Sequence, residues 1–375
     1  MKIIYAIPLL VLFLAVHSAH AATLPGIPEF IDEMVTKHKF KRAELESVFA
    51  NAQHVPSVID AISRPSTSKP WLEYRAAFVN PQRIKLGLEF WHRYRETLRR
   101  AERKYGVPQE IIVAVIGVET IYGQDAGTFR TIDALTTLAF DYPPRADFFR
   151  SELENFLLLA REQQFDLLAI RGSYAGALGI PQFMPSSYRI YAVDFNGNRR
   201  INLLREAKDA IGSVANYLRY FGWIGDAPGV FQSAGAGKSL PHKEYVRVMP
   251  PIAVRAQVSE EICAGDITTP RTLAAWSAAG IVPGANLAQD LAARLIDFTV
   301  GEGDEKLLKE PLAIRLSEQT TLAKSLVMSG HPKEFWLVFN NFEVITRYNN
   351  SDFYAMSVFQ LAEALKQARK TNHAK

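Results

Sequence analysis

The chain has 375 residues, of which 48% are hydrophobic and 22% are charged. This composition is typical of a large globular protein with two or three subdomains, and it excludes a disordered or fibrous chain. The formal net charge is +4, and Lys and Arg are interspersed with Asp and Glu. Because no block of like charge stands out, nucleic acid is a poor candidate partner, whereas an anionic polymer such as a cell wall is compatible.

The first 21 residues have the pattern of a secretory signal peptide. A Lys is followed by an apolar run at residues 3–16 and by small residues that predict cleavage after Ala21. No later segment has about 18 consecutive apolar residues, so we expect no transmembrane segment in the mature chain. The single cysteine, Cys263, lies far from the cleavage point. We therefore expect no lipid attachment and no internal disulfide, and we interpret Cys263 as a small buried side chain.

Apolar residues at three- and four-residue spacing predict helices through most of the N-terminal part. The pattern covers residues 29–40 and 42–52 and a long segment at 81–106. Prolines and serines at 62–78 predict an extended crossing between them. Pro108 then opens another helix at a position where its missing N–H costs little. Apolar residues cover most of the circumference of that helix, which predicts that it is buried.

The remainder of the chain changes from helical to β-rich and back. Helical patterns recur at residues 148–163 and 207–222, and a final one follows at 352–370. Beyond Gly237, short connections with Gly and Pro separate segments that predict a small β-rich insertion. These β-rich segments are 246–258, 311–319 and 334–349.

Glu119 is a lone carboxylate near the end of the apolar helix that Pro108 opens. Val115 and Ile116 lie about one turn before it on the same side of the helix. Packing among these side chains would exclude water, raise the pKa of the carboxyl group and favour a general acid near neutral pH. The alternative is an ordinary helix-end Glu that reaches solvent or an Arg.

A segment rich in small residues, at 172–188, is the first candidate for a ligand-binding loop. Small side chains allow close approach to a ligand, and neutral polar groups suit a polymer of hydroxyls and amides such as a sugar chain. A tight structural turn is the alternative. The small residues are Gly172, Ala175, Gly176, Ala177 and Gly179, and the polar ones are Ser173, Tyr174, Gln182 and Ser186. The aromatic residues that could stack on sugar rings, or simply pack, are Tyr74, Trp91, Tyr122, Tyr217 and Tyr348.

Four motifs in order resemble the lytic murein transglycosylase B family, glycoside hydrolase family 103. They are VETIYG, GALGIPQFMPSSY, DAIGSVANYLRYFGW and FNNFEVITRYNNSDFYAMSVFQLA. The likeness covers most of the mature chain and is weakest at residues 226–334. The sequence GIPQF replaces the more common GYGQF of the family, which affects the expected shape of the cleft rather than the chemistry.

The resemblance implies a mainly α (α+β) fold with a lysozyme-like core, a flanking helical domain and a small β-rich domain. On this basis we expect a signal peptide at 1–21, a helical domain at 22–104, a catalytic core at 105–240, a β-rich domain at 241–335, and a C-terminal segment at 336–375 that returns to the core and the helical domain.

The activity that the resemblance implies is cleavage of the β-1,4 bond between N-acetylmuramic acid and N-acetylglucosamine without water, leaving a 1,6-anhydromuramoyl end. The catalytic acid of the family matches Glu119. The substrate-cleft residues match Tyr74, Ser173, Gln182, Tyr217 and Tyr348.

A lysozyme-type glycosidase normally uses two carboxylates. The nearest candidates after Glu119 are Asp125, Asp133 and Asp141, and the small-residue loop has none. Asp133 is expected within a helix and Asp141 in a turn or cap. A mechanism with a single acid fits this pattern: Glu119 protonates the glycosidic oxygen and then takes the proton of the C6 hydroxyl as that oxygen attacks C1. No cofactor is required for this chemistry.

The loop at 194–209 resembles the EF-hand-like calcium site of the family. Its alternating side-chain oxygens and a Gly at a sharp turn suit calcium. Asparagines stand where carboxylates are usual, and the stretch to its last carboxylate is about one residue longer than expected for the family, so weak or lost binding is expected. An Asn-Gly turn without metal is the alternative. The candidate ligands are Asp194, Asn196, Asn198, Arg200 through its backbone carbonyl, and Asp209.

These observations predict a periplasmic lytic transglycosylase whose partner is the glycan strand of peptidoglycan, with no nucleic acid involved. The sequence does not identify partner enzymes of the cell wall. A muramidase that hydrolyses the same bond is one alternative. A non-catalytic peptidoglycan-binding protein of the same fold is another, although the intact Glu119 argues against it.

Overall fold

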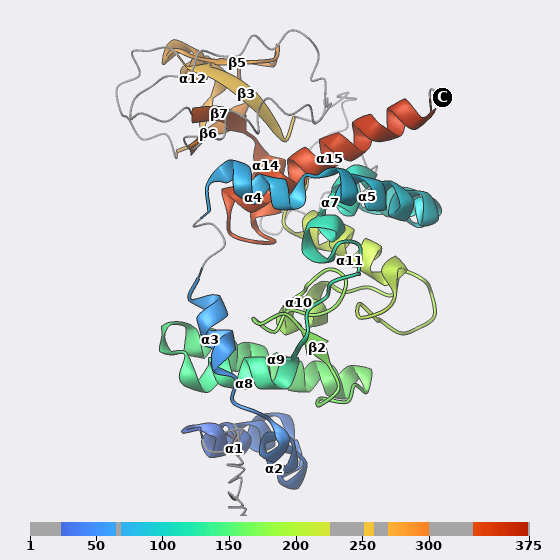
Figure 1. The fold of residues 1–375 in the computed structure, drawn as a ribbon, viewed down its shortest axis with the longest axis vertical. Coiled ribbons are helices and arrows are strands. Elements are labelled where there is room, and N and C mark those ends of the chain that lie inside the picture. Colours follow the sequence, from blue (N-terminus) through green and yellow to red (C-terminus); the bar gives the residue numbers. More distant parts are fainter. Residues whose placement is uncertain (1–23, 65–68, 226–250, 259–268, 300–332, 374–375) are drawn as a thin grey trace, which may run out of the picture.

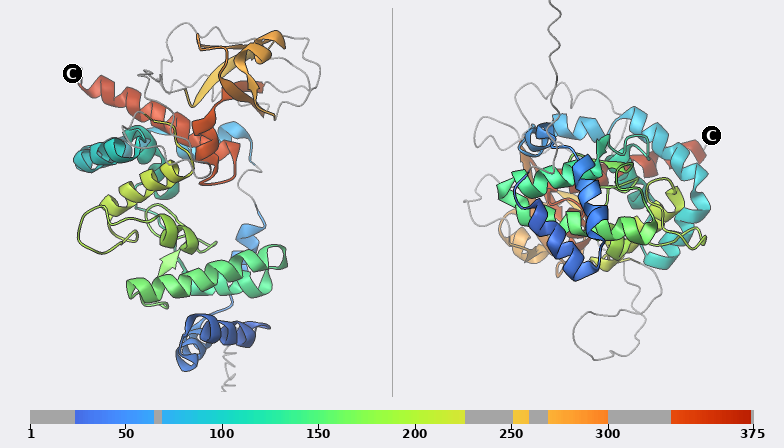
Figure 2. Two further views of the ribbon diagram at one scale, coloured as in Figure 1. Left: turned by 180° about the vertical axis from the view of Figure 1, so that it is seen from behind. Right: turned by 90° about the horizontal axis from the view of Figure 1, so that it is seen from below.

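The structure of the chain is a computed structural model, and it describes residues 24–64, 69–225, 251–258, 269–299 and 333–373. Helices and one small sheet are stacked along the longest axis of the molecule (Figure 1). The sheet lies at one end of the stack and the N-terminal helices at the other. The view from behind shows the same order (Figure 2).

Helices dominate the described part of the chain. They are α1 (Ile27–His38), α2 (Arg42–Asn51), α3 (Pro56–Ile62), α4 (Trp71–Phe78), α5 (Pro81–Arg93), α6 (Arg95–Tyr105), α7 (Gln109–Thr120), α8 (Thr131–Asp141), the 3-10 helix η3 (Pro143–Arg145), α9 (Ala146–Gln163), α10 (Pro185–Tyr191), α11 (Ala207–Tyr220), α12 (Leu273–Ala278), α14 (Asn340–Thr346) and α15 (Asp352–His373). None of these described helices has both the length and the apolar character needed to cross a membrane.

The strands form two sheets. A two-stranded sheet pairs β1 (Phe129–Arg130) with β2 (Arg171–Gly172). The larger sheet is antiparallel with the order β4-β6-β7-β3-β5. Its strands are β3 (Ala253–Val258), β4 (Arg271–Thr272), β5 (Ile281–Pro283), β6 (Ala292–Thr299) and β7 (Lys333–Val338).

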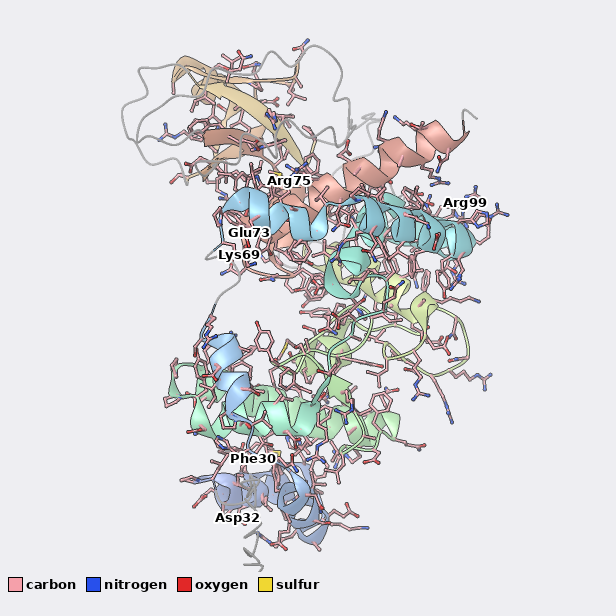
Figure 3. All side chains as sticks on the ribbon, in the orientation of Figure 1. Phe30, Asp32, Lys69, Glu73, Arg75 and Arg99 are labelled. Carbon is pink, nitrogen blue, oxygen red and sulfur yellow. The ribbon has the colours of Figure 1, made fainter. Side chains whose placement is uncertain are left out.

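The helices before residue 106 lie in two groups. The first group, α1 to α3, packs on the layer formed by α8 and α9: α3 contacts α8, and an edge-to-face contact of Phe30 with Phe140 joins α1 to α8. The second group, α4 to α6, packs against α7, α11 and α15. Figure 3 shows the side chains that fill both layers, with Phe30 in the first and Lys69 and Glu73 on the outer side of the second.

Helix α7 lies at the centre of the second layer, surrounded by α5, α6, α11 and α15. All of its residues from Ile111 to Val118 are buried. This explains why its sequence is apolar on every side, since burial of each large aliphatic side chain contributes roughly 1.5–3 kcal/mol. The helix begins after Pro108, as predicted from the sequence.

The larger sheet has its own hydrophobic cluster, in which Trp276 packs with apolar residues of the strands. Several contacts join the sheet to the helical part, and strand β6 supplies two of them. The ring of Phe298 stacks on Trp71 of α4 with centroids 4.5 Å apart. Arg294 of β6 forms ion pairs with Glu343 and Asp352, each at 2.7 Å. The C-terminal segment therefore links the sheet to the helical core.

Three predictions of secondary structure need correction. The segment 62–78 was expected to be extended, but Trp71–Phe78 is helix α4, because Pro70 is the N-cap residue of that helix and does not interrupt it. The long segment 81–106 is two helices that meet at Tyr94. The β-rich segment 334–349 is a strand only up to Val338 and then becomes α14.

The predicted helices at 29–40, 42–52, 148–163, 207–222 and 352–370 are confirmed by α1, α2, α9, α11 and α15. Within 246–258, strand β3 is confirmed. The predicted β-rich segment 311–319 and Cys263 lie outside the described residues. Strands β4, β5 and β6 were not predicted, and neither was the short helix α12.

Candidate active site

Glu119 lies in the last turn of α7, and its side chain is partly accessible to solvent. Burial raises the pKa of its carboxyl group from 4.5 to about 7, and a hydrogen bond from Tyr354 offsets part of this shift. The group is therefore protonated at mildly acidic pH and ready to ionise near neutrality. This is the property that a residue acting first as an acid and then as a base requires.

The end of α7 has an unusual backbone that turns the chain sharply away after Glu119. Ile121 and Tyr122 both have positive φ angles, of 50° and 62°. The Tyr122 hydroxyl donates to the carbonyl oxygen of Arg83 at 2.9 Å, so its ring packs between α5 and α7. A side chain at Gly117 would collide with this ring, which explains the small residue one turn before the helix ends.

A hydrogen bond of Thr120 joins the small-residue loop to the end of α7. Its hydroxyl donates to the carbonyl oxygen of Ile180 at 2.7 Å and accepts from the backbone N–H of Gly123 at 3.0 Å. Thr120 is fully buried, so these bonds are shielded from water and strong enough to fix the spacing. As a result, Ile180 of the loop is held against the residue that follows Glu119.

Within the loop, Ser173 and Gln182 form hydrogen bonds that define its shape. The Ser173 hydroxyl accepts from the backbone N–H of Ala177 at 3.0 Å. The Gln182 side chain donates to the carbonyl oxygens of Ala126 at 3.1 Å and Gly179 at 2.8 Å. Both residues are partly accessible. Their side chains are thus engaged mainly with the backbone of the loop and of Ala126.

Two of the loop glycines are required by close backbone approach. A Cβ atom on Gly172 would lie 2.2 Å from the carbonyl oxygen of Ala177, and one on Gly179 would lie 2.3 Å from that of Leu203. Gly179 also has a φ of 69°, which larger residues rarely adopt. These two glycines therefore serve the turn itself.

Tyr354 is the functional residue that the sequence did not single out. Its hydroxyl donates to Glu119 Oε1 at 2.6 Å, although the two residues are 235 positions apart in the chain. Tyr354 lies in the first turn of α15 and is 2% exposed. Burial and the nearby charge of Glu119 raise its pKa well above the usual value, so it remains a donor. Its position in the last of the four motifs was the one available signal.

Tyr348 and Tyr217 lie beside this pair. The ring of Tyr348 stacks on Tyr354 with centroids 6.3 Å apart, and it lies 4.8 Å from the ring of Tyr217. The Tyr348 hydroxyl donates to the carbonyl oxygen of Pro181 at 2.7 Å, which ties the C-terminal segment to the small-residue loop. Burial, followed by the charge of Glu119, raises the pKa of Tyr348. Both tyrosines are therefore part of the same site.

Tyr74 and Trp91, the other aromatic candidates, pack in the core. Tyr74 is 5% exposed and lies among aromatic rings that include Phe353, the neighbour of Tyr354. Trp91 is buried, and its indole N–H donates to the side chain of Gln109 at 2.8 Å. Tyr74 is therefore a core residue next to Phe353, and Trp91 is a core residue bound to Gln109 at the start of α7.

The other carboxylates considered in the sequence have different partners. Asp133, within α8 as predicted, pairs with Arg130 at 2.6 Å. Asp141 ends α8 and lies 2.7 Å from a ring nitrogen of His54. Asp125 is exposed. In the part of the chain that the structure describes, no carboxylate is among the groups that shift the pKa of Glu119.

Comparison with known proteins identifies the family of the chain. A family model described as "Transglycosylase SLT domain" matches residues 24–363. The chain belongs to this family. It is 39% identical over 359 residues to membrane-bound lytic murein transglycosylase B of Escherichia coli K12, which covers 93% of this chain and 84% of that protein.

Solved structures of the transglycosylase family share the fold. Soluble lytic transglycosylase SltB1 from Pseudomonas aeruginosa is 40% identical, with a TM-score of 0.73 and coverage of 92% of this chain and 100% of that chain. Lytic transglycosylase Slt35 from E. coli, in complex with calcium, is 36% identical, with a TM-score of 0.74 and coverage of 94% and 96%. The expected mainly helical, lysozyme-like fold with a small β-rich part is therefore confirmed.

In this member of the transglycosylase family, side chains of the loop at 194–209 form hydrogen bonds to the backbone of the same loop. Asp194 accepts from the backbone N–H groups of Gly197 and Arg199, each at 2.7 Å. Asp209 is fully buried and accepts from Phe195 at 2.9 Å and Asn202 at 3.0 Å. Oδ1 of each carboxylate also accepts a second backbone N–H, from Asn198 for Asp194 and from Asn196 for Asp209, so the carboxylate oxygens are already largely occupied by backbone amides.

The donor chemistry of this loop fits a calcium ion only weakly. Asn196 and Asn198 offer amide oxygens, which are suitable hard ligands without charge. Arg199 and Arg200 are exposed in the same turn and add positive charge. Among the described residues, no group of three or more His, Cys, Asp and Glu side chains is arranged to hold a metal ion.

The raised pKa of Glu119 predicts a dependence of stability on pH. A carboxyl group whose pKa is higher in the folded state binds more protons there, so its burial destabilises the fold progressively as pH rises from 4.5 to 7. The cost reaches about 3 kcal/mol above pH 7. We expect Glu119→Gln to raise the free energy of unfolding by about this amount at pH 8, and much less at pH 5.

Urea unfolding at the two pH values measures this difference. Glu89→Gln is the matched control, because Glu89 is exposed on α5. The control is expected to change stability little at either pH. A Glu119→Gln protein that gains no stability between pH 5 and pH 8 relative to the parent would contradict the raised pKa.

Proposed function

We propose that the chain is a peptidoglycan lytic transglycosylase that cleaves the N-acetylmuramic acid β-1,4-N-acetylglucosamine bond and leaves 1,6-anhydromuramoyl ends. One observation carries the proposal: the carboxyl group of Glu119, whose pKa is raised by burial, lies at the end of α7 and accepts a hydrogen bond from the hydroxyl of Tyr354. Membership of the transglycosylase family supports the same substrate.

In the first step, the protonated Glu119 gives its proton to the glycosidic oxygen. The bond between that oxygen and C1 of the muramoyl sugar breaks, and its electron pair remains with the leaving sugar. The N-acetyl carbonyl oxygen of the muramoyl sugar stabilises the positive charge at C1. Desolvation of Glu119 favours this step because it raises the pKa, so that a larger fraction of Glu119 is protonated near neutral pH.

In the second step, the ionised Glu119 takes the proton of the C6 hydroxyl while O6 forms a bond to C1. The carboxyl group is again protonated and water is not consumed. The Tyr354 hydroxyl stabilises the ionised state between the two steps, because a hydrogen bond to a carboxylate is stronger than one to the neutral acid. Holding the nucleophile within the same sugar supplies the proximity that a second enzyme carboxylate would otherwise provide.

The masses of the products distinguish this reaction from its alternatives. Digestion of purified sacculi is expected to release muropeptides with anhydro ends, which are one water lighter than the products of a muramidase. Products of full mass would support the hydrolytic alternative. Absence of any release, with binding retained, would support a non-catalytic peptidoglycan-binding protein.

We also propose that the chain is exported to the periplasm after removal of residues 1–21. The N-terminal pattern of a Lys, an apolar run and small residues supports this. The intact mass of the protein recovered from a periplasmic extract tests the cleavage point. A mass that includes the first 21 residues would contradict it.

We propose further that the loop at 194–209 binds calcium weakly through Asp194, Asn196, Asn198, the carbonyl of Arg200, and Asp209. At a calcium concentration equal to the Kd, the ion would stabilise the fold by about 0.4 kcal/mol. Replacing Asn196 and Asn198 together by Asp adds charge to the ligand set. If this tightens binding about tenfold, the same concentration stabilises the variant by about 1.4 kcal/mol.

Thermal unfolding with and without calcium measures both values. Asn51→Asp, an exposed change in α2, is the control for added negative charge outside the loop. An equal response to magnesium, or no gain in the doubly substituted protein, would contradict a calcium site in this loop.

A further inference from the structure

A run of tyrosine rings leads from the candidate active site towards the end of α10. Tyr354, which binds Glu119, stacks on Tyr348. Tyr348 in turn contacts Tyr217, with centroids 4.8 Å apart. Tyr217 then meets Tyr191, the last residue of α10, edge to face at 5.0 Å. The run therefore extends beyond the residues assigned to the site.

Tyr191 continues this run to Tyr220, the last residue of α11, with ring centroids 4.7 Å apart. Phe221 packs against both rings, at 5.4 Å and 5.2 Å. The rings of Tyr354 and Tyr217 are buried, at 2% and 7% exposed, whereas Tyr191 is partly exposed and Tyr220 is 65% exposed. Burial and then the neighbouring Tyr220 raise the pKa of Tyr191, in agreement with the contact between the two rings.

We propose that Tyr191 and Tyr220 form a platform for an additional sugar of the glycan strand, outside the site around Glu119. The inference rests on the proposed function, because a long glycan is the substrate that would extend from that site. Aromatic faces pack on the apolar faces of sugar rings, and phenol hydroxyls bind sugar hydroxyl and amide groups. The platform would thus select long strands without taking part in the chemistry.

The contact run separates Tyr220 from an ordinary exposed aromatic residue. Single exposed apolar side chains are common on protein surfaces and require no ligand. Ile190, which is 62% exposed on α10, is such a residue. Tyr220 instead ends a series of ring contacts that begins at the hydrogen-bond partner of Glu119. Through the buried Tyr217, these contacts fix Tyr191 and Tyr220 a few side chains from Tyr348, so a strand that leaves the carboxylate past Tyr348 would next meet these two more exposed rings.

The test compares long purified glycan strands with the shortest fragment that the unsubstituted protein cleaves. We expect Tyr220→Ala to raise KM for long strands about tenfold, which is the effect of losing one aromatic contact. The rate on the shortest fragment should remain unchanged. Tyr220→Phe should retain most of the affinity, and Ile190→Ala is the matched control for loss of an exposed apolar side chain from the same surface.

The outcomes separate the platform from the reaction itself. If the unsubstituted protein releases no anhydro products, the proposed function fails. If it does release them and Tyr220→Ala acts on both substrates like the parent, the platform alone is wrong. An equal loss on long and short substrates would also contradict the platform, because it would assign Tyr220 a structural role. The melting temperature of Tyr220→Ala checks that the fold is intact.

Discussion

Glu119→Gln is expected to lower the rate of muropeptide release from sacculi by about 10³-fold or more, since general acid–base catalysis contributes about 10²–10⁴-fold and one residue serves both steps. Gln has nearly the same shape and can still accept the hydrogen bond from Tyr354, but it cannot give or take a proton. Binding of glycan strands should therefore persist. Release by mass spectrometry and binding to sacculi by sedimentation measure the two effects separately.

Asp125→Asn is the matched control for this substitution. Asp125 is the next carboxylate after Glu119 in the sequence and is exposed in the turn that follows α7. In a single-carboxylate mechanism, this variant should retain activity within a few-fold of the parent. If Asp125→Asn lost as much activity as Glu119→Gln, the reaction would require two carboxylates and the hydrolytic alternative would gain support.

Tyr354→Phe is expected to lower the maximal rate by about 10- to 100-fold, the range that follows from misplacing a reacting group. It should also move the alkaline limb of the pH profile of kcat/KM. The hydrogen bond from Tyr354 lowers the pKa of Glu119, so its loss should raise that pKa and shift the limb to higher pH. This direction distinguishes a positioning residue from one that only supports the fold, because general destabilisation would lower the rate without such a shift.

Tyr105→Phe provides the control for loss of a buried tyrosine hydroxyl. Tyr105 is 7% exposed and packs against Phe195, in α6 rather than α15. Its pH profile should match that of the parent. A Tyr354→Phe protein whose alkaline limb stays in place or moves to lower pH would show that the hydroxyl does not act on Glu119.

Much of this site could be predicted because its main parts are local in sequence. The apolar pattern around Glu119 predicts a buried helix, and α7 is buried on every side. The small residues from Gly172 to Gly179 predict a close turn, and the structure explains two of them by backbone contact. The order of four motifs then linked these segments, which composition and periodicity alone could not do.

The partner of the carboxylate could not be predicted from local pattern. Tyr354 lies 235 positions from Glu119, and its apolar helical surroundings in α15 look like ordinary core packing. The resemblance matched Tyr348 of the same segment to the substrate cleft and assigned no role to Tyr354. Only the packing of α15 against α7 brings the hydroxyl to the carboxylate.

The structure explains two of the errors in secondary structure. Pro70 suggested a break but precedes the first turn of α4, where the fixed φ of proline suits the start of a helix. Val344 and Ile345 suggested a strand, yet both are buried within α14. There, Asn341 binds the backbone of Ile224 in both directions, at 2.8 Å each way. Tertiary contacts decided the conformation in that segment against the local preference.

The most direct test of the central claim is digestion of sacculi in water enriched in ¹⁸O, followed by mass measurement of the new muramoyl ends. Because the C6 hydroxyl is the proposed nucleophile and Glu119 handles both protons, the account predicts anhydro ends that contain no ¹⁸O. Muramoyl ends that carry ¹⁸O at C1 as the primary product would show that water attacks, and would contradict a mechanism in which the substrate supplies its own nucleophile.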